Sequence, residues 1–128
     1  TPHMGEMVRL SGHSVEELKQ KPLELAAAYA NEHEVILVLK DARTVVTDGE
    51  RIVLNTTGNN GMATGGSGDV LTGIITGLLA QGMAPFEAAV SGVYLHGLAG
   101  DRAAENTGVR GMLSTDLLKE LPGVLKEG

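Results

Sequence analysis

The sequence predicts an α/β fold, and three observations support this prediction. A helical run rich in Ala and Leu, residues 23–31, leads into a continuous apolar segment, VILVLK at residues 35–40. A short hairpin pattern follows this segment, and long helical patterns fill the second half of the chain. A helix that leads into a strand buried on both faces is typical of α/β proteins with parallel sheets.

The helices of the first half are predicted from their boundary residues. Ser14 and Glu17 have the spacing of a capping box, so a helix is expected to begin there. Pro22 interrupts this helix, and the run at residues 23–31 forms a second one. Two helices are therefore expected before the buried strand.

A β-hairpin is expected after the strand. The segments Thr44–Thr47 and Arg51–Asn55 form its two strands, and Asp48–Gly49 between them favours a tight turn. The predicted inventory is then one buried strand and a hairpin against four or five helices. Because a strand covered on both faces needs more neighbours, the chain is expected to be the C-terminal part of a larger α/β domain.

Three more helices are expected in the second half. Apolar residues between Val70 and Leu79 recur at helical spacing, and Gly82 is suited to end that helix. The expected helices run from Ser67 or Gly68 to about Gln81, from Pro85 to about Glu105, and from Ser114 or Thr115 to a limit at Pro122.

The glycine-rich segment Asn59–Asp69, NNGMATGGSGD, has the composition of a phosphate-binding loop. Gly65, Gly66 and Gly68 allow backbone N–H groups to approach an anion without obstruction by a Cβ atom. The following helix adds the positive end of its dipole. Asp69 falls in the first turn of this helix, where a carboxylate can accept a proton from a hydroxyl that attacks a phosphoryl group.

Better-known motifs do not fit this segment. A Walker A loop needs Gly-Lys-Ser/Thr, but no lysine follows Gly66. A dinucleotide fingerprint that starts at Gly66 needs a glycine where Leu71 stands, and a nucleophile elbow around Ser67 needs a glycine where Asp69 stands. A flexible linker followed by a capping aspartate is the structural alternative.

Composition and charge restrict the possible functions of the 128-residue chain. Its formal net charge of −6, with few and scattered basic residues, argues against a nucleic-acid surface. It has no Cys, which excludes disulfides and thiol catalysis and fits a cytoplasmic location. The apolar run Val35–Leu39 is too short to span a membrane, and the N-terminal residues lack the pattern of a signal peptide.

The loop and four other segments resemble one enzyme family. NTTGN at residues 55–59 and GMATGGSGDVLTG at 61–73 closely resemble the nucleotide-binding segment of the ADP/ATP-dependent NAD(P)H-hydrate dehydratases, which belong to the ribokinase-like superfamily. TPH at 1–3 with GEM at 5–7 resembles their substrate-side motif, and KDART at 40–44 resembles their KGxxT segment. YLHGLAGD at 94–101 and residues 113–122 resemble two of their helices, so that the resemblance covers essentially the whole chain.

The resemblance implies a ribokinase-like three-layer α/β/α fold. Residues 1–128 would be a single C-terminal portion of that domain, without its N-terminal part. Such a portion is expected to form a homo-oligomer or to associate with the part that carries the remaining strands. A fused epimerase domain is common in the family.

The reaction that the resemblance implies is repair of hydrated nicotinamide cofactor. Hydrated NADH or NADPH, (S)-NAD(P)HX, would lose water in a step driven by ADP or ATP, with Mg²⁺ held through the nucleotide phosphates. Phosphorylation of the ring hydroxyl converts a poor leaving group into a good one. The resemblance does not decide between ADP and ATP.

The resemblance also assigns site residues. Asp69 is the expected catalytic base and lies at the substrate, and His3 is the expected substrate contact. The expected nucleotide-binding residues are Lys40, Asp41, Ala42, Arg43, Thr44, Asn59, Asn60, Gly61, Met62, Ala63, Thr64, Gly65, Gly66, Ser67 and Gly68. A protein-ligated metal is not expected, because no two histidines have the spacing of metal ligands.

The chain departs from the family pattern at three positions. Met4 and Asn60 stand where proline is usual, which loosens loops without removing a reactive group. Asp41 stands where glycine is usual, and its negative charge is expected to weaken nucleotide binding.

Several polar residues have structural alternatives. His3 could bond to the backbone as a loop histidine, Glu6 could orient that loop or lie in a helix first turn, and Lys40 could be a solvated lysine at a strand end. His96 and Asp101 are five residues apart, and small neighbours around them favour a role in helix packing.

Two other functions are compatible with the sequence. The chain could be a small-molecule kinase of the same superfamily, although its TPHxGEM opening argues against this. It could also be a non-catalytic nucleotide-binding or assembly module.

Overall fold

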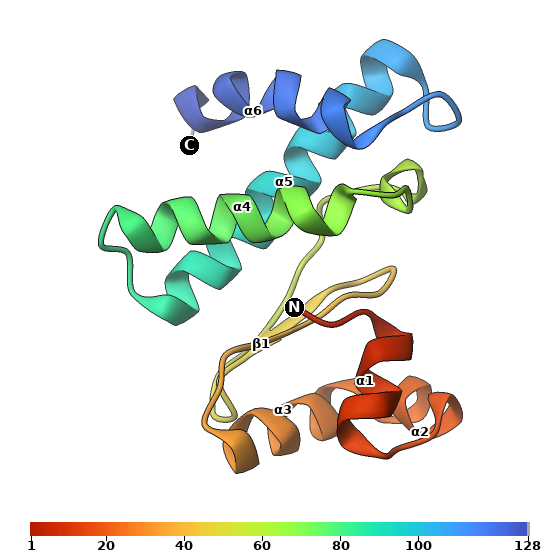
Figure 1. Cartoon of the computed structure of the whole chain (residues 1–128), viewed down its shortest axis with the longest axis vertical. Helices are drawn as coiled ribbons and strands as arrows, with labels where there is room; N and C mark the ends of the chain where they lie inside the picture. The colour runs from red at the N-terminus through yellow and green to blue at the C-terminus, as the bar shows by residue number, and fades with distance from the viewer. Residues whose placement is uncertain (128) are drawn as a thin grey trace. The chain divides into compact units, whose positions relative to one another are not determined.

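The computed structural model describes residues 1–127, and the chain divides into two compact units (Figure 1). The first unit, Thr1–Asn55, contains α1 (Met4–Ser11), α2 (Val15–Gln20), α3 (Pro22–His33), β1 (Leu37–Leu39), β2 (Val45–Thr47) and β3 (Ile52–Leu54). The second unit begins at Thr56 and contains a 3₁₀ turn, η1 (Asn60–Met62), and the helices α4 (Ser67–Ala80), α5 (Pro85–Thr107) and α6 (Ser114–Glu127).

Helix α1 is an addition to the predicted elements. Within the described residues there are six α-helices, whereas the sequence predicts four or five. The cap of α1 explains the difference. The side chain of His3 accepts a hydrogen bond from the N–H of Glu6, and the side chain of Glu6 accepts one from the N–H of His3. Histidine is not among the usual capping residues, so the sequence signal for this start is weak.

The predicted helix and hairpin of the first unit are confirmed. Ser14 and Glu17 form the expected capping box of α2, and Pro22 opens α3. The two hairpin strands form β2 and β3, with the turn at residues 48–51 between them. Each strand is one or two residues shorter than predicted.

The buried strand is shorter than predicted, and its pairing with neighbouring strands differs from the prediction. It covers Leu37–Leu39 rather than residues 35–40, because the N–H of Val35 still bonds to the end of α3. The sheet order is β1-β2-β3, and both pairings are antiparallel, in contrast to the expected parallel sheet. A single parallel bridge joins His3 to Lys40, and the N–H of Lys40 donates to the Pro2 carbonyl at 2.9 Å.

The sheet of the first unit carries its core on the face toward the helices. Helix α3 packs against β1 and β2. The buried side chains of this core come from three helices and two strands: Met7, Leu18, Ala26, Ala30, Leu37, Leu39 and Val45. The edge strand β3 is less covered, since Ile52 and Leu54 are 43% and 42% exposed.

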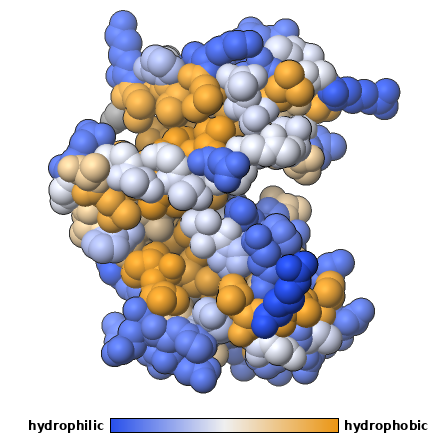
Figure 2. Space-filling view, in the orientation of Figure 1, coloured by the Kyte–Doolittle hydropathy of each residue, from blue (hydrophilic) through white to orange (hydrophobic). Residues whose placement is uncertain are grey.

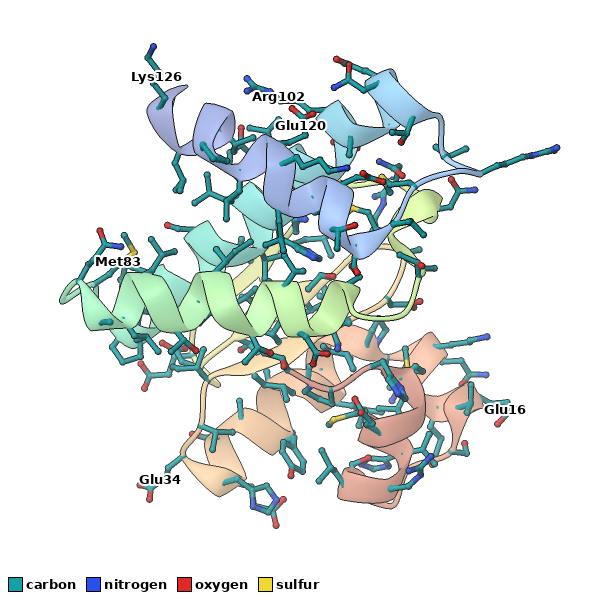
Figure 3. All side chains as sticks on the ribbon, turned by 45° about the horizontal axis from the view of Figure 1, so that its top comes forward. Glu16, Glu34, Met83, Arg102, Glu120 and Lys126 are labelled. Carbon is teal, nitrogen blue, oxygen red and sulfur yellow. The ribbon has the colours of Figure 1, made fainter. Side chains whose placement is uncertain are left out.

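Helix α5 is the centre of the second unit, where it packs against both α4 and α6. The core between α5, α6 and the adjoining loop contains Leu95, Ala99, Ala103, Met112, Leu117 and Val124. At the surface of the α5–α6 contact, the side chain of Asn106 donates to Glu120 at 2.8 Å. Glu120 projects from α6 (Figure 3). Small residues along α5 allow its neighbours to approach closely.

Helix α6 continues through Pro122, which the sequence predicts as its limit. Proline lacks the N–H that would bond to the preceding turn, so it normally kinks or ends a helix. Here Leu117 and Val124, on either side of the proline, are both fully buried in the same core. Tertiary packing therefore holds the two parts of α6 together.

The surface over α6 is partly apolar (Figure 2). Leu118 and Leu125 are 51% and 49% exposed. In the described part of the chain no helix combines the length and apolar character needed to cross a bilayer.

Candidate functional site

The start of α4 has the geometry of an anion site. Its N-cap residue is Gly66, which adopts φ 90° and ψ −13°, a left-handed conformation that favours glycine. A Cβ atom at this position would also lie 2.7 Å from the hydroxyl oxygen of Ser114. The N–H of Ser67 donates to the Thr64 carbonyl at 3.2 Å, but no side chain caps the helix, so the N–H groups of Gly68 and Asp69 can meet a bound anion.

Asp69 lies in the first turn of α4, as the sequence predicts. Its side chain is exposed, and it forms no hydrogen bond or ion pair with any residue that the structure describes. The space around Gly65, four residues before Asp69, is also open, because a Cβ atom there would meet nothing within 4 Å. A carboxylate in this position can accept a proton beside a phosphate bound at the helix start.

The loop before α4 is held by a carboxylate of α5. Asp101 accepts hydrogen bonds from the N–H of Gly58 at 2.9 Å and from the side-chain amide of Asn59 at 3.0 Å. The oxygen of the same Asn59 side chain accepts from the N–H of Gly61 at 3.0 Å and caps η1. Both ends of the Asn59 side chain are therefore engaged within the loop.

The end of the loop is held by a second residue of α5. The Nε2 atom of His96 lies 2.9 Å from the carbonyl oxygen of Ser67 and 3.3 Å from its hydroxyl oxygen. Both side chains are buried. The structural role that the sequence favours for His96 and Asp101 thus includes more than helix packing, since the two side chains bond to opposite ends of the same loop.

A close approach between α5 and residue 57 completes this support. The hydroxyl of Thr57 donates to the carbonyl of Tyr94 at 2.9 Å. A Cβ atom on Gly97 would clash with the Thr57 hydroxyl and lie 2.7 Å from its carbonyl carbon. Gly97 therefore allows the chain to lie directly on α5.

The predicted substrate residue His3 has a local structural role. Its Nδ1 atom accepts from the N–H of Glu6 at 3.2 Å, and its Nε2 atom lies 3.5 Å from the Glu6 carboxylate. The hydrogen bond from the His3 backbone N–H is the main cause that lowers the pKa of Glu6. The side chain of His3 is still 56% exposed, so its capping role leaves much of the ring accessible.

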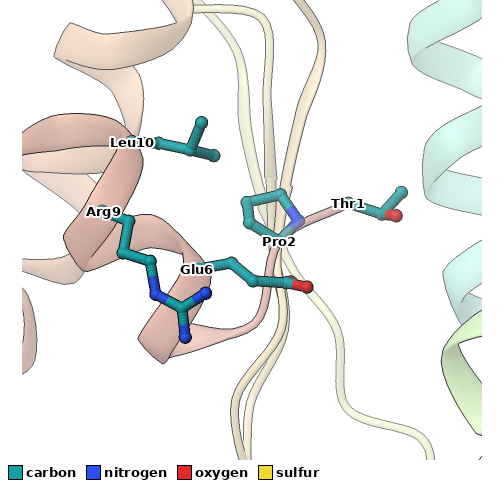
Figure 4. Close-up of a pocket in the computed structure, with 5 residues that line it drawn as sticks. All are labelled: Thr1, Pro2, Glu6, Arg9 and Leu10. Carbon is teal, nitrogen blue, oxygen red and sulfur yellow. The ribbon is translucent and has the colours of Figure 1, made fainter.

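A pocket of about 450 Å³ lies beside this motif (Figure 4). Its lining residues are Thr1, Pro2, Glu6, Arg9 and Leu10. The carboxylate and the guanidinium project from α1, while the proline and leucine add apolar surface (Figure 4). This combination can receive a polar ligand that also has an apolar face.

The segment Lys40–Thr44 connects β1 to β2. Lys40 pairs with His3 through the parallel bridge, so the structure brings these two predicted site residues together. The side chains of Asp41, Ala42 and Arg43 are exposed. Thr44 is partly buried, and its carbonyl accepts from the N–H of Asn55 at 2.9 Å.

Within the described residues, no group of three or more His, Asp or Glu side chains is arranged to hold a metal ion. The open backbone amides of α4 fit a phosphate better than a cation. The expectation that a divalent ion is held through nucleotide phosphates and water stays a prediction.

Comparison with known proteins identifies the family of the chain. The model of the NAD(P)H-hydrate dehydratase family matches residues 1–123. The bifunctional NAD(P)H-hydrate repair enzyme Nnr of Moorella thermoacetica is 55% identical over 98% of the chain. The ADP-dependent (S)-NAD(P)H-hydrate dehydratase of Bacillus subtilis is 39% identical, also over 98%.

Solved structures give the same result and confirm the ribokinase-like fold. The Bacillus subtilis ADP/ATP-dependent NAD(P)H-hydrate dehydratase, co-crystallised with ATP and Mg²⁺, matches 98% of the chain with a TM-score of 0.93 and 37% identity. A ribokinase-like superfamily protein of Enterococcus faecalis matches 98% with a TM-score of 0.86 and 38% identity. The matches cover 46% and 43% of those two chains.

The chain spans only part of its curated relatives. It covers 24% of the Moorella enzyme and 46% of the Bacillus enzyme. Within that span the similarity is continuous, and it includes both the glycine-rich loop and the α5 helix that supports it. The chain belongs to the NAD(P)H-hydrate dehydratase family.

Proposed function

We propose that this chain takes part in ADP- or ATP-dependent dehydration of (S)-NAD(P)HX to NAD(P)H. The observation that carries the proposal is the start of α4, where uncapped amides and the exposed carboxylate of Asp69 lie within one helical turn. The amides suit a nucleotide phosphate, and the carboxylate suits a general base for phosphoryl transfer. The names of the relatives agree with this chemistry.

Asp69 is the proposed catalytic base. Its carboxylate would accept the proton of the ring hydroxyl of the hydrated cofactor as the hydroxyl oxygen attacks phosphorus. The bound nucleotide would supply its terminal phosphoryl group and leave as AMP from ADP or as ADP from ATP. The phosphorylated hydroxyl would then depart as inorganic phosphate while the ring loses a proton, which gives NAD(P)H. The N–H groups at the start of α4 would stabilise the negative charge on the phosphoryl oxygens.

The glycine-rich loop and residues 40–44 are the proposed nucleotide-binding segments. In the loop, Gly65, Gly66 and Gly68 provide close backbone approach, and Ser67 begins the helix. His3 is the proposed substrate contact, since its side chain is 56% exposed although Nδ1 accepts in the helix cap and Nε2 lies 3.5 Å from the Glu6 carboxylate. Arg9 and Glu6 extend this surface into the neighbouring pocket.

The activity is proposed for the longer protein architecture that the relatives share. The chain covers between 24% and 46% of the relatives described above. The proposed partner is therefore the sequence that these relatives carry outside the matched region. The exposed edge strand β3 and its apolar residues, Ile52 and Leu54, are compatible with further contacts of the first unit.

The test is recovery of NADH absorbance from hydrated NADH in the presence of ADP or ATP. The variant Asp69→Asn removes the base but keeps the size of the side chain. We expect kcat to fall by about 10²- to 10⁴-fold while nucleotide affinity stays within a few-fold of wild type. Undiminished turnover in this variant would remove Asp69 from the proposed role.

A small-molecule kinase is the second candidate, because the α4 site favours phosphoryl transfer in general. The same preparation should be assayed for ATP consumption with a panel of sugar and vitamin-precursor alcohols. Phosphorylation of a panel member without repair of hydrated NADH would favour the kinase over the dehydratase.

A further inference from the structure

We infer that Asp101 and Asn59 form a hydrogen-bond relay, in which every donor meets an acceptor, and that this relay sets the conformation of the proposed nucleotide loop. Asp101 is a positioning residue in this relay, and it acts on the loop through Asn59 and Gly58. The inference rests on the proposed nucleotide site and adds to it a residue outside the glycine-rich motif.

The relay has three hydrogen bonds in sequence. The Asp101 carboxylate uses Oδ2 for the N–H of Gly58 and Oδ1 for the side-chain Nδ2 of Asn59. The other end of the same Asn59 side chain accepts a hydrogen bond, since its Oδ1 bonds to the N–H of Gly61 in η1. Donors and acceptors are therefore matched at every step from α5 to the loop.

The polarity of the relay fixes the orientation of the Asn59 amide. A carboxylate has only acceptors, so it selects the NH₂ side of Asn59 and leaves the oxygen for Gly61. A neutral amide at position 101 would present one donor and one acceptor to two donors. One of the three hydrogen bonds would then be lost, and the Asn59 side chain could rotate.

The negative charge of the relay is carried by Asp101 on α5 and not by a residue of the loop itself. Asp101 and Asn59 are both partly buried, and Asp101 lies on α5. Its charge makes the hydrogen bonds stronger than those of a neutral acceptor. The loop is thus held in one conformation before any nucleotide arrives, which lowers the ordering cost of binding.

The test exchanges the two side-chain types. Asp101→Asn alone mismatches the relay, and Asn59→Asp alone sets two carboxylates against each other. The double variant Asp101→Asn/Asn59→Asp can again form all three hydrogen bonds, with the negative charge moved from position 101 to position 59. Glu105→Gln is the matched control, since it removes one negative charge from an exposed position on the same helix.

Three quantities are measured on the full chain: the dissociation constants of ADP and ATP, the thermal midpoint Tm, and the hydrogen-exchange rate of the Gly61 amide. We expect each single variant to weaken nucleotide binding by about tenfold or more and to speed exchange at Gly61. The double variant should recover exchange protection and Tm, and it should bind nucleotide more tightly than Asn59→Asp. The control should match wild type in all three.

Three outcomes would overturn the inference. In the first, Asp101→Asn binds nucleotide and protects Gly61 as wild type does. In the second, the effects of the two substitutions simply add in the double variant, which would show that the residues do not act through each other. A wild-type chain that binds neither ADP nor ATP would also overturn it.

These results are independent of the reaction chemistry. Binding and exchange are measured without hydrated NADH, so an inactive wild-type chain that still binds nucleotide would contradict the dehydratase proposal alone. Normal repair activity with an unchanged Asp101→Asn variant would contradict the relay alone.

Discussion

The imidazole of His96, in the middle of α5, contacts the first residue of α4, with Nε2 2.9 Å from the carbonyl oxygen of Ser67. This contact holds the helix start two residues before Asp69. Because the carbonyl accepts, Nε2 must carry a proton, which fixes the tautomer of a neutral His96. The buried side chain of His96 therefore helps to fix the position of the exposed side chain of Asp69.

Replacing His96 with Ala should loosen the start of α4. The carbonyl of Ser67 would lose a buried donor, at a cost of about 1–3 kcal/mol in the free energy of unfolding. Amide hydrogen exchange at Val70, whose N–H donates to the Gly66 carbonyl at 3.1 Å, should also become faster than in wild type. Denaturant unfolding and exchange measurements check this, with Glu105→Ala on the same helix as the control. Equal stability of the two variants would show that the contact contributes little.

Gly97→Ala should destabilise the second unit. The added methyl group would clash with the Thr57 hydroxyl and approach the backbone, which has little room to move. Overpacking of this kind typically costs about 1–3 kcal/mol. The chain offers a matched control in Gly73→Ala on α4, because its Cβ would meet nothing within 4 Å. That substitution should stabilise the helix by up to about 1 kcal/mol.

The two substitutions are expected to change the free energy of unfolding in opposite directions, and this difference is the test. Both convert a helical glycine to alanine, so helix propensity alone predicts a gain for each. Thermal unfolding of the two variants separates propensity from packing. A gain in Tm for Gly97→Ala would contradict the close approach between α5 and Thr57.

The sequence predicts the parts of this molecule that depend on local signals. Ser14 with Glu17, and Pro22 after them, place α2 and α3 correctly because capping and proline effects act within one turn. The glycine-rich motif places Asp69 in the first turn of α4 for the same reason. The family resemblance, and with it the ribokinase-like fold, is confirmed by the comparisons.

Features that depend on distant residues are not visible in the sequence. Pro122 marks a helix end by its local chemistry, but the burial of Leu117 and Val124 overrides it. The contacts of His96 and Asp101 join residues that are 29 and 42 or more positions apart, and no spacing rule connects them. The roles of the individual site residues remain predictions.

The turn of the β-hairpin should make stability depend on pH in acid. The hydrogen bond from the Arg51 backbone N–H, followed by that from its side chain, lowers the pKa of Asp48 from 3.8 to about 2. A carboxyl whose pKa is lower in the folded state stabilises the fold above its unfolded pKa. This contribution should be complete above about pH 4 and disappear as the pH falls through about 2.

Asp48→Asn should therefore be less stable than wild type at neutral pH, and the difference should vanish toward pH 2. The measurement is denaturant unfolding at a series of pH values, with Glu50→Gln in the same turn as the control. A difference between Asp48→Asn and wild type that does not change with pH would mean that the charge of Asp48 is not its cause.

Asp41 offers a prediction about nucleotide affinity. It stands, exposed, in the segment after β1 that resembles a nucleotide-binding motif with glycine at this position. If nucleotide phosphates approach this segment, removal of the negative charge should strengthen binding. We expect Asp41→Asn to lower the Kd for ADP by a few-fold at low ionic strength, the usual size of an exposed charge effect.

Ionic strength identifies the cause of this effect. Screening shortens the range of an exposed charge to about 8 Å at physiological salt, so the gain in affinity should shrink as salt is added. Glu50→Gln removes the same charge from the same unit but outside this segment, and its effect on the Kd should be smaller. Equal effects of the two substitutions would indicate a response to net charge rather than to a charge at position 41.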